Sequence, residues 1–404
     1  MPASTAATLF EGRGDPGVGK ARGMAPEELI AVVAASGLRG RGGAGYPLAD
    51  KLRAVVAAAK QDDRETLLVA NAYDADPDSP LARTLIMRSR ANVLQGVAIA
   101  AHAIGAREAI IYMHPQADGA RKSMEDDIVV RRGGLAPLTV TVAQGPGGFM
   151  GGEESALMNV LESRRAMAHQ RPPYPAQNGV QQRPTLISSA ETIAWLPQIV
   201  DGGARADTKL VSVTGAVNSP GVYEVPLGTT LGAILDKAGG VTGTLKGIHV
   251  GGPTGGVLAA SKRDTKLGFE ELRAAGTHMG SAQIRAIASD TCVVAYAAKL
   301  FAYLAKETCG ICVPCRVGTA RVQGILEGVQ SQLGRDTDTA WLAELGDHME
   351  KFSLCGFGIT APSILKTTMS EFAADYRAHI QDRKCPTGTC APIRARRYET
   401  MAQP

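Results

Sequence analysis

Hydrophobic and polar positions alternate with two different periods over the first half of the chain. Short apolar runs rich in strand-forming residues occupy 66–72, 108–114 and 137–145. The apolar spacing typical of helices occupies 25–36, 89–106 and 152–166. Strands and helices that alternate in this way favour a parallel sheet covered by helices. The pattern therefore predicts an α/β domain of the Rossmann-like type over residues 24–200.

The second half of the chain has two further patterns. Two alternating runs flank the turn sequence NSPG at 218–221, which predicts a β-hairpin, and a short helix closed by glycines follows. Residues 201–285 are therefore expected to form a small mixed domain with one helix on a sheet. Beyond it, four amphipathic segments with short connections predict a four-helix bundle of antiparallel neighbours over 286–384. The two ends, 1–23 and 385–404, are assigned to a loose N-terminal segment and a tail.

Composition and charge exclude several classes of function. Aromatic residues make up 4% of the 404 residues and the net charge is only +4, so the chain lacks the stacking and basic surfaces of nucleic-acid binding. No stretch has the features of a signal peptide or of a membrane-spanning helix. Seven cysteines, all in the last third of the chain, fit metal ligation under reducing conditions better than a disulfide framework. We therefore expect a cytoplasmic protein that binds metal and has no nucleic-acid partner.

The strongest chemical signal is the sequence ETCGICVPCRVGT, which places Cys309, Cys312 and Cys315 two residues apart. Zinc sites usually pair their ligands two by two, whereas this triple run matches the first part of a cubane iron–sulfur signature. Cys355, in FSLCGFG, follows the third predicted bundle helix. Because the first and third links of a four-helix bundle lie at the same end, we expect Cys355 to be the fourth ligand of a 4Fe–4S cluster. The alternatives are a structural zinc ion or free thiols.

The other three cysteines carry weaker signals. Cys292 lies on the apolar face of the first predicted bundle helix, where a lone cysteine is usually a small buried hydrophobe. Cys385 and Cys390, in RKCPTGTC, are interpreted as two free exposed thiols on the tail. The alternative is that they form half of another metal site, completed by a partner.

Two glycine-rich segments in the predicted α/β domain indicate an anionic cofactor. GLRGRGGAGYPLADK, at 37–51, packs five glycines into nine residues, which lets backbone N–H groups converge on a phosphate without Cβ clashes. Arg39, Arg41 and Lys51 add positive charge there. The second segment, GGFMGGEESAL, brings the adjacent carboxylates of Glu153 and Glu154. Together with the cysteine run, these segments describe a redox protein with a nucleotide-type cofactor.

These motifs also resemble those of a known family. SGLRGRGGAGYP, GGEESAL, RPPYP, RPTLISSAET and ETCGICVPCRVGT follow in the order found in the NADH-binding flavoprotein subunit of respiratory complex I, a subunit type that also occurs in NAD-linked hydrogenases and formate dehydrogenases. The resemblance extends over about residues 24–390. The middle section resembles that family's β-grasp domain of the SLBB type, and the end resembles its cluster-binding bundle. The tail sequence HIQDRKCPTGTC is more similar to the hydrogenase and formate dehydrogenase branch.

The resemblance implies a diaphorase-type subunit, which exchanges hydride between NAD(H) and FMN and single electrons with a 4Fe–4S cluster. It also implies two partners, a thioredoxin-like iron–sulfur subunit and a further catalytic subunit. Glu153 and Glu154 are implied as catalytic residues that border the flavin and the nicotinamide. The other positions implied to bind FMN or NAD(H) are Gly40, Arg41, Gly42, Gly43, Gly45, Tyr46, Lys51, Asn71, Asp74, Asp76, Phe149, Gly152, Arg171, Tyr174, Ser188, Ser189 and Thr192.

Several positions of the implied flavin pocket depart from the family pattern. In NAYDADPD, Tyr73 stands where the family has Asp, and Asp74 stands where it has Glu. Ser188 and Ser189 replace a pair of asparagines, and Phe149 replaces a tyrosine. We expect all of them to border the flavin.

These departures leave three interpretations. The first is an active flavin subunit with an altered pocket, which we prefer because the glycines and the paired acids are retained. The second is a flavin- or NAD-deficient paralogue that relays electrons through its cluster or has a structural role. The third is a glycine-rich α/β domain that binds another nucleotide.

Overall fold

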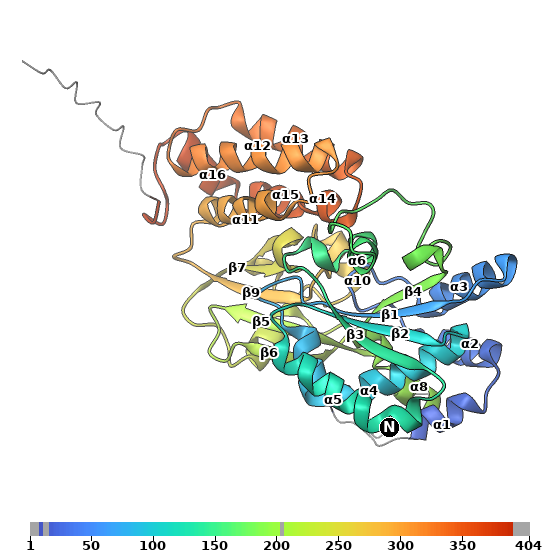
Figure 1. Ribbon diagram of the computed structural model, residues 1–404. Coiled ribbons are helices and arrows are strands. Elements are labelled where there is room, and N and C mark those ends of the chain that lie inside the picture. The colour runs from blue at the N-terminus through green and yellow to red at the C-terminus, as the bar shows by residue number, and fades with distance from the viewer. Residues whose placement is uncertain (1–7, 11–15, 203–205, 391–404) are drawn as a thin grey trace, which may run out of the picture.

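The computed structural model describes residues 8–10, 16–202 and 206–390. Figure 1 shows an N-terminal α/β region in blue and green, a smaller sheet in yellow beside it, and the C-terminal helices in orange and red above both. The predicted fold class, α/β followed by a small mixed domain and a helical region, is therefore confirmed.

The N-terminal region is built on a parallel sheet with the strand order β3-β2-β1-β4. Its strands are β1 (Leu67–Ala72), β2 (Glu108–Met113), β3 (Thr139–Gln144) and β4 (Thr185–Ser189). The apolar runs predicted the first three, whereas β4 was not predicted. In the register of β1 with β4, Asn71 pairs with Ser189. Both residues therefore lie at the carboxyl edge of the sheet, where open α/β sheets bind ligands.

Helices cover this sheet on both sides. They are α1 (Pro16–Arg22), α2 (Pro26–Ala35), α3 (Leu48–Asp62), α4 (Leu81–Ile104), α5 (Asp118–Leu135), α6 (Glu154–Leu161), α7 (Ala190–Ile193) and α8 (Leu196–Gly202), with 3-10 turns at Met150–Gly152 and Val180–Gln182. Leu68 and Ala70 of β1 share a core with Leu94 and Val97 of α4. The 15-residue helix α3 was not predicted as a separate element.

Two parts of the N-terminal region differ from the sequence-based expectation. Helix α4 begins before the predicted 89–106, and its backbone is non-helical at Ser89, so the predicted segment is the part after this kink. The segment expected to be loose contains α1, and within it Leu9 and Ala21 are buried. The backbone N–H of Leu9 donates to Glu224 Oε1 at 2.8 Å, which ties this segment to the middle domain.

The middle domain is a mixed sheet with the strand order β6-β5-β9-β7-β8. Its strands are β5 (Thr208–Gly215), β6 (Gly221–Pro226), β7 (Leu245–Val250), β8 (Gly256–Ala259) and β9 (Gln283–Ala288), with helices α9 (Leu231–Lys237) and α10 (Phe269–Ala274) and 3-10 turns at Gly252–Thr254 and Ala260–Lys262. The predicted hairpin is the antiparallel pair β5 and β6. The parallel pairing of β5 with β9, which was not predicted, closes the centre of the sheet.

The C-terminal region consists of helices packed side by side. They are α11 (Val293–Glu307), α12 (Val313–Gln330), α13 (Asp338–Phe352), α14 (Gly356–Thr360), α15 (Ser363–Glu371) and α16 (Ala373–Ile380). The fourth predicted helix is thus divided at Phe372, and it does not begin with a Thr360 cap, because the Thr360 hydroxyl donates to Gly356 O at 2.7 Å within α14. In the part of the chain described, no helix has the length and apolar character needed to cross a membrane.

Candidate functional site

A cavity of about 330 Å³ opens at the carboxyl edge of the parallel sheet. The glycine segment after α2, the turn before α6, the ends of β1 and β4 and one residue of the helical region contribute to it. The implied binding residues that line it are Gly40, Gly42, Gly45, Tyr46, Lys51, Asn71, Gly152, Glu153, Glu154, Arg171, Ser188, Ser189 and Thr192. Segments far apart in the sequence therefore meet at one site.

The glycine segment closes on itself at the mouth of the cavity. The Gly40 N–H donates to Tyr46 O at 2.8 Å. A Cβ placed on Gly42 meets only the Cβ of Ser189, at 3.6 Å, so the backbone here is open toward the cavity. Gly43 has φ +110°, and a Cβ there would lie 2.9 Å from the carbonyl oxygen of Gly280 in the middle domain. Gly43 therefore serves the packing of the two domains and does not line the cavity.

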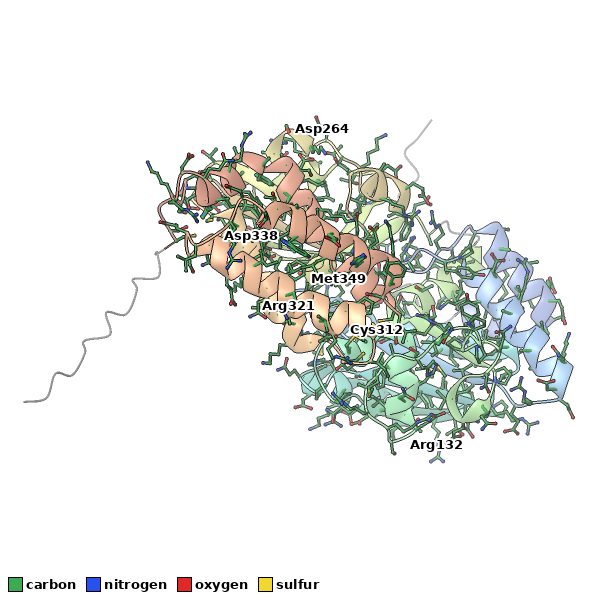
Figure 2. The ribbon with its side chains drawn as sticks, turned by 90° about the horizontal axis from the view of Figure 1, so that it is seen from above. Arg132, Asp264, Cys312, Arg321, Asp338 and Met349 are labelled. Atoms are coloured by element: carbon green, nitrogen blue, oxygen red, sulfur yellow. The ribbon has the colours of Figure 1, made fainter. Side chains whose placement is uncertain are left out.

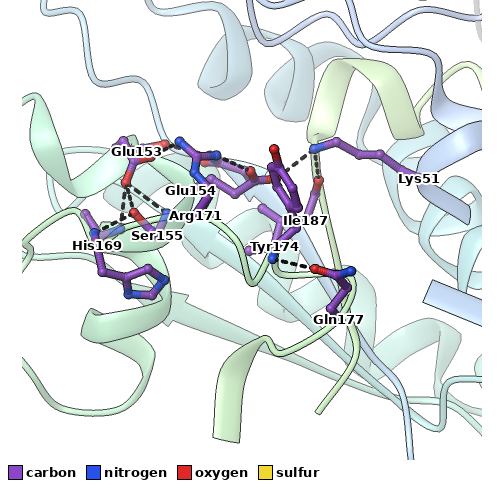
Figure 3. Close-up of polar contacts among 12 residues, drawn as sticks. Lys51, Glu153, Glu154, Ser155, His169, Arg171, Tyr174, Gln177 and Ile187 are labelled. Carbon is purple, nitrogen blue, oxygen red and sulfur yellow. Dashed lines mark hydrogen bonds and ion pairs between the residues drawn. The ribbon is translucent and has the colours of Figure 1, made fainter. Parts of the chain in front are cut away.

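Four charged side chains form a linked network along one wall (Figure 3). Lys51 Nζ lies 2.7 Å from Glu154 Oε1 and also donates to Ile187 O at 3.0 Å. Arg171 contacts both acids, with Nη1 3.0 Å from Glu154 Oε2 and Nη2 3.1 Å from Glu153 Oε1. Two cations and two carboxylates thus meet at the cavity, where they can contact both an anionic and a hydrogen-bonding part of a ligand.

Helix α6 holds Glu153 in one orientation. Glu153 precedes the helix, and its Oε2 accepts hydrogen bonds from the backbone N–H groups of Ser155 and Ala156, each at 2.9 Å. A carboxylate at a helix N-terminus caps free N–H groups and interacts favourably with the helix dipole. The Ser155 hydroxyl accepts a hydrogen bond from His169 N at 3.1 Å, which holds the loop that carries Arg171 near the acids.

Other implied binding residues do not line the cavity. Buried Arg41 directs its guanidinium to the carbonyl oxygen of Ala206 at the start of the middle domain. The ring of Phe149 packs against Phe357 of the helical region, with ring centroids 5.5 Å apart. Tyr174 is 54% exposed on the proline-rich loop.

The two implied acids of the strip after β1 also face other partners. Asp74 accepts hydrogen bonds from Ala82 N at 2.7 Å and Arg83 N at 3.0 Å, at the start of α4. Asp76 accepts from the Ser281 hydroxyl at 2.5 Å and so joins the α/β region to the middle domain. Burial raises the pKa of each carboxyl to about 6. These acids stabilise the frame of the site.

Tyr73 also lies outside the cavity. Its ring stacks on Tyr112 with centroids 5.2 Å apart, and its hydroxyl donates to Gly148 O at 3.0 Å. A Cβ on Gly151 would lie 2.4 Å from the Tyr73 hydroxyl oxygen, so the turn before α6 rests directly on this side chain. Tyr73 is therefore a support behind the turn that carries Glu153 and Glu154. Tyr73 was expected to border the cofactor. Its side chain does not line the cavity, because it packs on the opposite face of the turn.

The cysteine run begins in the link between α11 and α12, as predicted, and ends in the first turn of α12. Cys312 precedes α12 directly, Cys315 lies in its first turn, and Cys355 directly precedes α14. Figure 2 shows Cys312 where the helical region meets the α/β region. A Cβ on Gly358 would lie 2.9 Å from Cys315 Cβ, so the short helix α14 rests against the cysteine run.

The four thiols of this site influence one another. Burial, together with the nearby Cys312, Cys355 and Cys309, raises the pKa of Cys315 to about 12. Burial also raises the pKa of Cys355 to about 11. Because metal ligation requires thiolates, loading of the site must release protons. Four cysteine sulfurs, three of them in a C-x2-C-x2-C run, match the donor set of a cubane iron–sulfur cluster.

The other three cysteines lie away from this site. Cys292 directly precedes α11 and is buried, as predicted. The expectation that Cys385 and Cys390 are exposed thiols on a tail is wrong, because both are buried against the helical core. The ligand atoms of these three cysteines and of His379 in α16 all lie within 4.8 Å of one another.

The cavity and the cysteine site are adjacent. Gly356 lines the cavity, and the residue before it, Cys355, belongs to the cysteine site. The charge of Glu153 also raises the pKa of Cys355. The sequence predicted Cys355 as a ligand but not Gly356 as a lining residue, although the position of Gly356 next to a predicted ligand was a usable signal.

A parallel α/β sheet with a charged cavity beside four cysteines defines a redox protein that combines a nucleotide-type cofactor with an iron–sulfur centre.

Comparison with known proteins identifies the family. The model described as Nuo51 FMN-binding domain matches residues 33–198, the SLBB domain matches 210–258, and the NADH-ubiquinone oxidoreductase-F iron-sulfur binding region matches 295–379. The NADP-reducing hydrogenase subunit HndC of Solidesulfovibrio fructosivorans is 33% identical, over 94% of this chain and 82% of that protein. The NADH-quinone oxidoreductase F subunit of Streptomyces coelicolor is 33% identical, over 92% of this chain and 87% of that protein.

A solved structure agrees with these relatives. A chain of an NAD⁺-reducing NiFe-hydrogenase in the H2-reduced state has a TM-score of 0.79 and 31% sequence identity to this chain. The match covers 94% of this chain but 65% of that one, so this chain spans somewhat less than two thirds of the solved chain. The chain belongs to the family of F-type subunits of NADH-quinone oxidoreductases and their hydrogenase counterparts, with FMN-binding, SLBB and iron–sulfur regions.

Proposed function

We propose that this chain is a diaphorase-type subunit that exchanges hydride between NAD(H) and FMN and single electrons with a 4Fe–4S cluster. The observation that carries this proposal is the contact between the two sites, where Gly356 lines the cavity and Cys355 belongs to the cysteine site. A bound flavin supplies the conversion between two-electron and one-electron chemistry. The residues of the two sites would hold the two groups next to each other.

The chain's own residues divide the binding work. The open backbone at Gly42 and the charge of Lys51 suit the phosphate end of FMN. Asn71 and Ser188, at the strand ends, face the same cavity and offer hydrogen-bonding groups to the rest of the flavin. Glu153, fixed by its helix-capping bonds, is the more rigid of the two acids and borders the reacting end.

The structure favours this function over a cofactor-deficient paralogue. Tyr73, the bulkiest departure from the family pattern, lies behind the turn and takes no space from the cavity. Ser188 and Ser189 line the cavity and keep hydroxyl groups where the family has amides. The departures therefore alter the polar lining without closing the site.

The assembly and location are part of the same proposal. The relatives are named as subunits of hydrogenases and quinone oxidoreductases, which supports a larger redox complex. We propose that a thioredoxin-like iron–sulfur subunit receives the electrons and that a further catalytic subunit handles the second substrate. A cytoplasmic location fits a protein whose cysteines must remain reduced to bind metal.

The proposal is tested on the full chain, purified without oxygen. We expect bound FMN that is released by denaturation, and bleaching of its absorption when NADH is added. Iron at the level of one cluster without releasable flavin or bleaching would contradict the diaphorase proposal and support the relay interpretation.

Replacing Lys51 with Met tests the assigned cavity. The substitution removes a charged hydrogen bond, which contributes about 1.5–3 kcal/mol, so FMN binding should weaken by at least about tenfold. Titration of the flavin-free protein with FMN measures the affinity. The matched control is Lys60→Met, because Lys60 also lies on α3 but pairs with Glu27 at the surface. Equal FMN affinity in both variants would place the cofactor elsewhere.

A further inference from the structure

The side chain of Glu307 reaches from the helical region into the α/β region. Glu307 is the last residue of α11, and its Oε2 accepts a hydrogen bond from Phe149 N at 2.6 Å. Phe149 belongs to the turn before α6, residues 147–152, which leads directly to Glu153. Figure 1 shows α6 next to the helical region. One hydrogen bond therefore links the segment before the cysteine run to the turn that carries the acids of the cavity.

The helix that carries Glu307 gives no reason for an acid at this position. The last turn of a helix has a partial negative charge, so it favours cations and disfavours carboxylates. Lys306, the preceding residue, is of the favoured kind and is exposed. Because Glu307 has an unfavourable interaction with its own helix dipole, we look for its role in what the carboxylate contacts.

The backbone of the turn before α6 leaves room for this carboxylate. Gly147 and Gly148 have φ +90° and +73°, values that favour glycine. A Cβ on Gly148 would lie 2.8 Å from Glu307 Oε2, so a larger residue at this position would press on the carboxylate. Glycine at 148 therefore allows the close approach that brings the acid to the Phe149 N–H.

The α/β region holds the same turn from the other side. The Tyr73 hydroxyl donates to Gly148 O at 3.0 Å. Asn71 Nδ2 donates to Gly152 O, also at 3.0 Å. Both donors lie at the end of β1 or directly after it. Glu307 supplies a contact from the helical region, so the turn is held between two regions. Gly152 lines the cavity, and the position of the turn therefore sets part of the cavity wall.

Glu307 also lies beside the cysteine site. Glu307 and Cys309 line a common cavity of about 320 Å³. The hydroxyl oxygen of Thr308, between them in sequence, lies 3.2 Å from Cys315 Sγ. Adjacent residues of one short segment thus contact the turn before α6 and the cysteine run. Charge near an iron–sulfur cluster is one of the factors that set its reduction potential.

We propose that Glu307 is a positioning residue for hydride exchange. Its carboxylate accepts the Phe149 N–H and so keeps the turn before α6, and with it Glu153, in a fixed place beside the cysteine site. This inference rests on the proposed diaphorase function. Because Glu307 belongs to α11 and not to the cysteine run itself, the contact does not require a bound cluster.

Hydrogen exchange at the Phe149 amide tests the contact without any cofactor. In the flavin-free protein, Glu307→Ala should accelerate exchange of this amide at least about tenfold, because a hydrogen bond to a charged group is lost. Glu307→Gln should keep most of the protection, because the Gln side-chain oxygen still accepts. The matched control is Glu327→Ala, which removes an exposed acid of α12 that bonds to Gln323 and should leave this amide unchanged.

Bleaching of bound FMN by NADH then tests the positioning. In protein with full FMN and iron, Glu307→Ala should slow bleaching at least about tenfold, because a misplaced group loses its alignment with the reacting atoms. Glu307→Gln should bleach at nearly the wild-type rate. The reduction potential of the cluster should rise in both variants, because both remove the charge. A bleaching rate that follows the hydrogen bond and not the potential is the signature of positioning.

Variants of Phe149 test the same bond from the donor side. Phe149 has φ −70°, which proline can adopt, so Phe149→Pro removes the N–H at a compatible φ. Phe149→Ala is the matched control, because it loses the ring and keeps the N–H. We expect slower bleaching in Phe149→Pro than in Phe149→Ala. This pair keeps the proposal testable if Glu307→Ala does not fold.

Several results would overturn the inference. Unchanged exchange of the Phe149 amide in Glu307→Ala would exclude the contact, and faster exchange with unchanged bleaching would exclude positioning. Bleaching as slow in Glu307→Gln as in Glu307→Ala would assign the effect to charge. Equal bleaching in the two Phe149 variants would also contradict it. A wild type without FMN or bleaching would overturn the diaphorase proposal as well, whereas failure of this inference alone is seen only in the variants.

Discussion

Tyr73 illustrates how a single side chain supports the site without entering it. It stacks on Tyr112, bonds to Gly148 O and lies under the glycines of the turn before α6. A carboxylate at this position would be buried beside the apolar ring of Tyr112. The tyrosine and the small residues above it thus form one packing unit that positions Glu153 and Glu154.

Substitutions at Tyr73 should therefore act on stability. Tyr73→Ala removes a buried ring and is expected to lower the free energy of unfolding by about 3–5 kcal/mol, whereas Tyr73→Phe should cost about 1 kcal/mol through the lost hydrogen bond. Chemical denaturation of the flavin-free protein measures both. Tyr174→Ala, at an exposed tyrosine, is the control and should change little. A Tyr73→Ala variant as stable as the wild type would contradict this packing role.

At the scale of elements, the start of α4 depends on an acid from the preceding loop. Asp74 accepts hydrogen bonds from Ala82 N and Arg83 N, and Arg83 Nε lies 3.2 Å from Asp74 Oδ2. Burial outweighs these contacts and raises the pKa of Asp74 to about 6. The folded state therefore binds the Asp74 proton more tightly than the unfolded chain, in which the carboxyl has its ordinary pKa near 4.

This shift predicts a pH dependence with a definite sign. The contribution of protonated Asp74 to the free energy of unfolding is fully present below pH 4 and is lost as the pH rises through 6. Acidification should therefore favour the folded wild type. Between pH 7 and pH 5.5, the free energy of unfolding of the wild type should rise by about 0.8 kcal/mol relative to Asp74→Asn, which cannot titrate. Denaturation of both proteins at the two pH values measures this difference. A wild type that loses stability relative to Asp74→Asn on acidification would contradict the raised pKa.

Elements with a strong pattern were predictable, and short ones were not. The apolar runs of β1 and β2 and the amphipathic spacing of α11 to α13 are long enough to show their period. In contrast, the five residues of β4 follow a proline-rich loop, and β9 pairs in parallel with a strand about 70 residues earlier. Such pairing depends on contacts between distant segments that no local period records.

At the scale of the whole molecule, function depends on where three regions meet. The cavity belongs to the α/β region except for Gly356, and the cysteine site belongs to the helical region. Asp76 bonds to Ser281, and Gly43 packs on Gly280, so the middle domain holds the glycine segment from behind. The frame that supports the cavity is therefore shared between domains.

Replacing Cys355 with Ala tests whether the two sites are separable. We expect loss of the iron–sulfur absorption and most of the iron, with releasable FMN and its bleaching by NADH retained, because most of the cavity lining lies outside the helical region. Iron content, flavin release and the visible spectrum measure these outcomes. Cys390→Ser serves as the matched control and should keep the iron. Simultaneous loss of flavin and iron would mean that the cavity requires the cluster-loaded link.

The sequence alone determined the chemistry available to this protein, because glycine density, adjacent acids and the spacing of Cys309, Cys312 and Cys315 are local properties. The tertiary structure decided which of these groups face a ligand. It directs the side chains of Arg41 and Tyr73 away from the cavity. It also brings Cys292, which precedes the first helix of the helical region, next to Cys385 and Cys390, which follow the last helix. The physical reason is that side-chain direction and long-range contact depend on packing between elements, which local spacing does not specify.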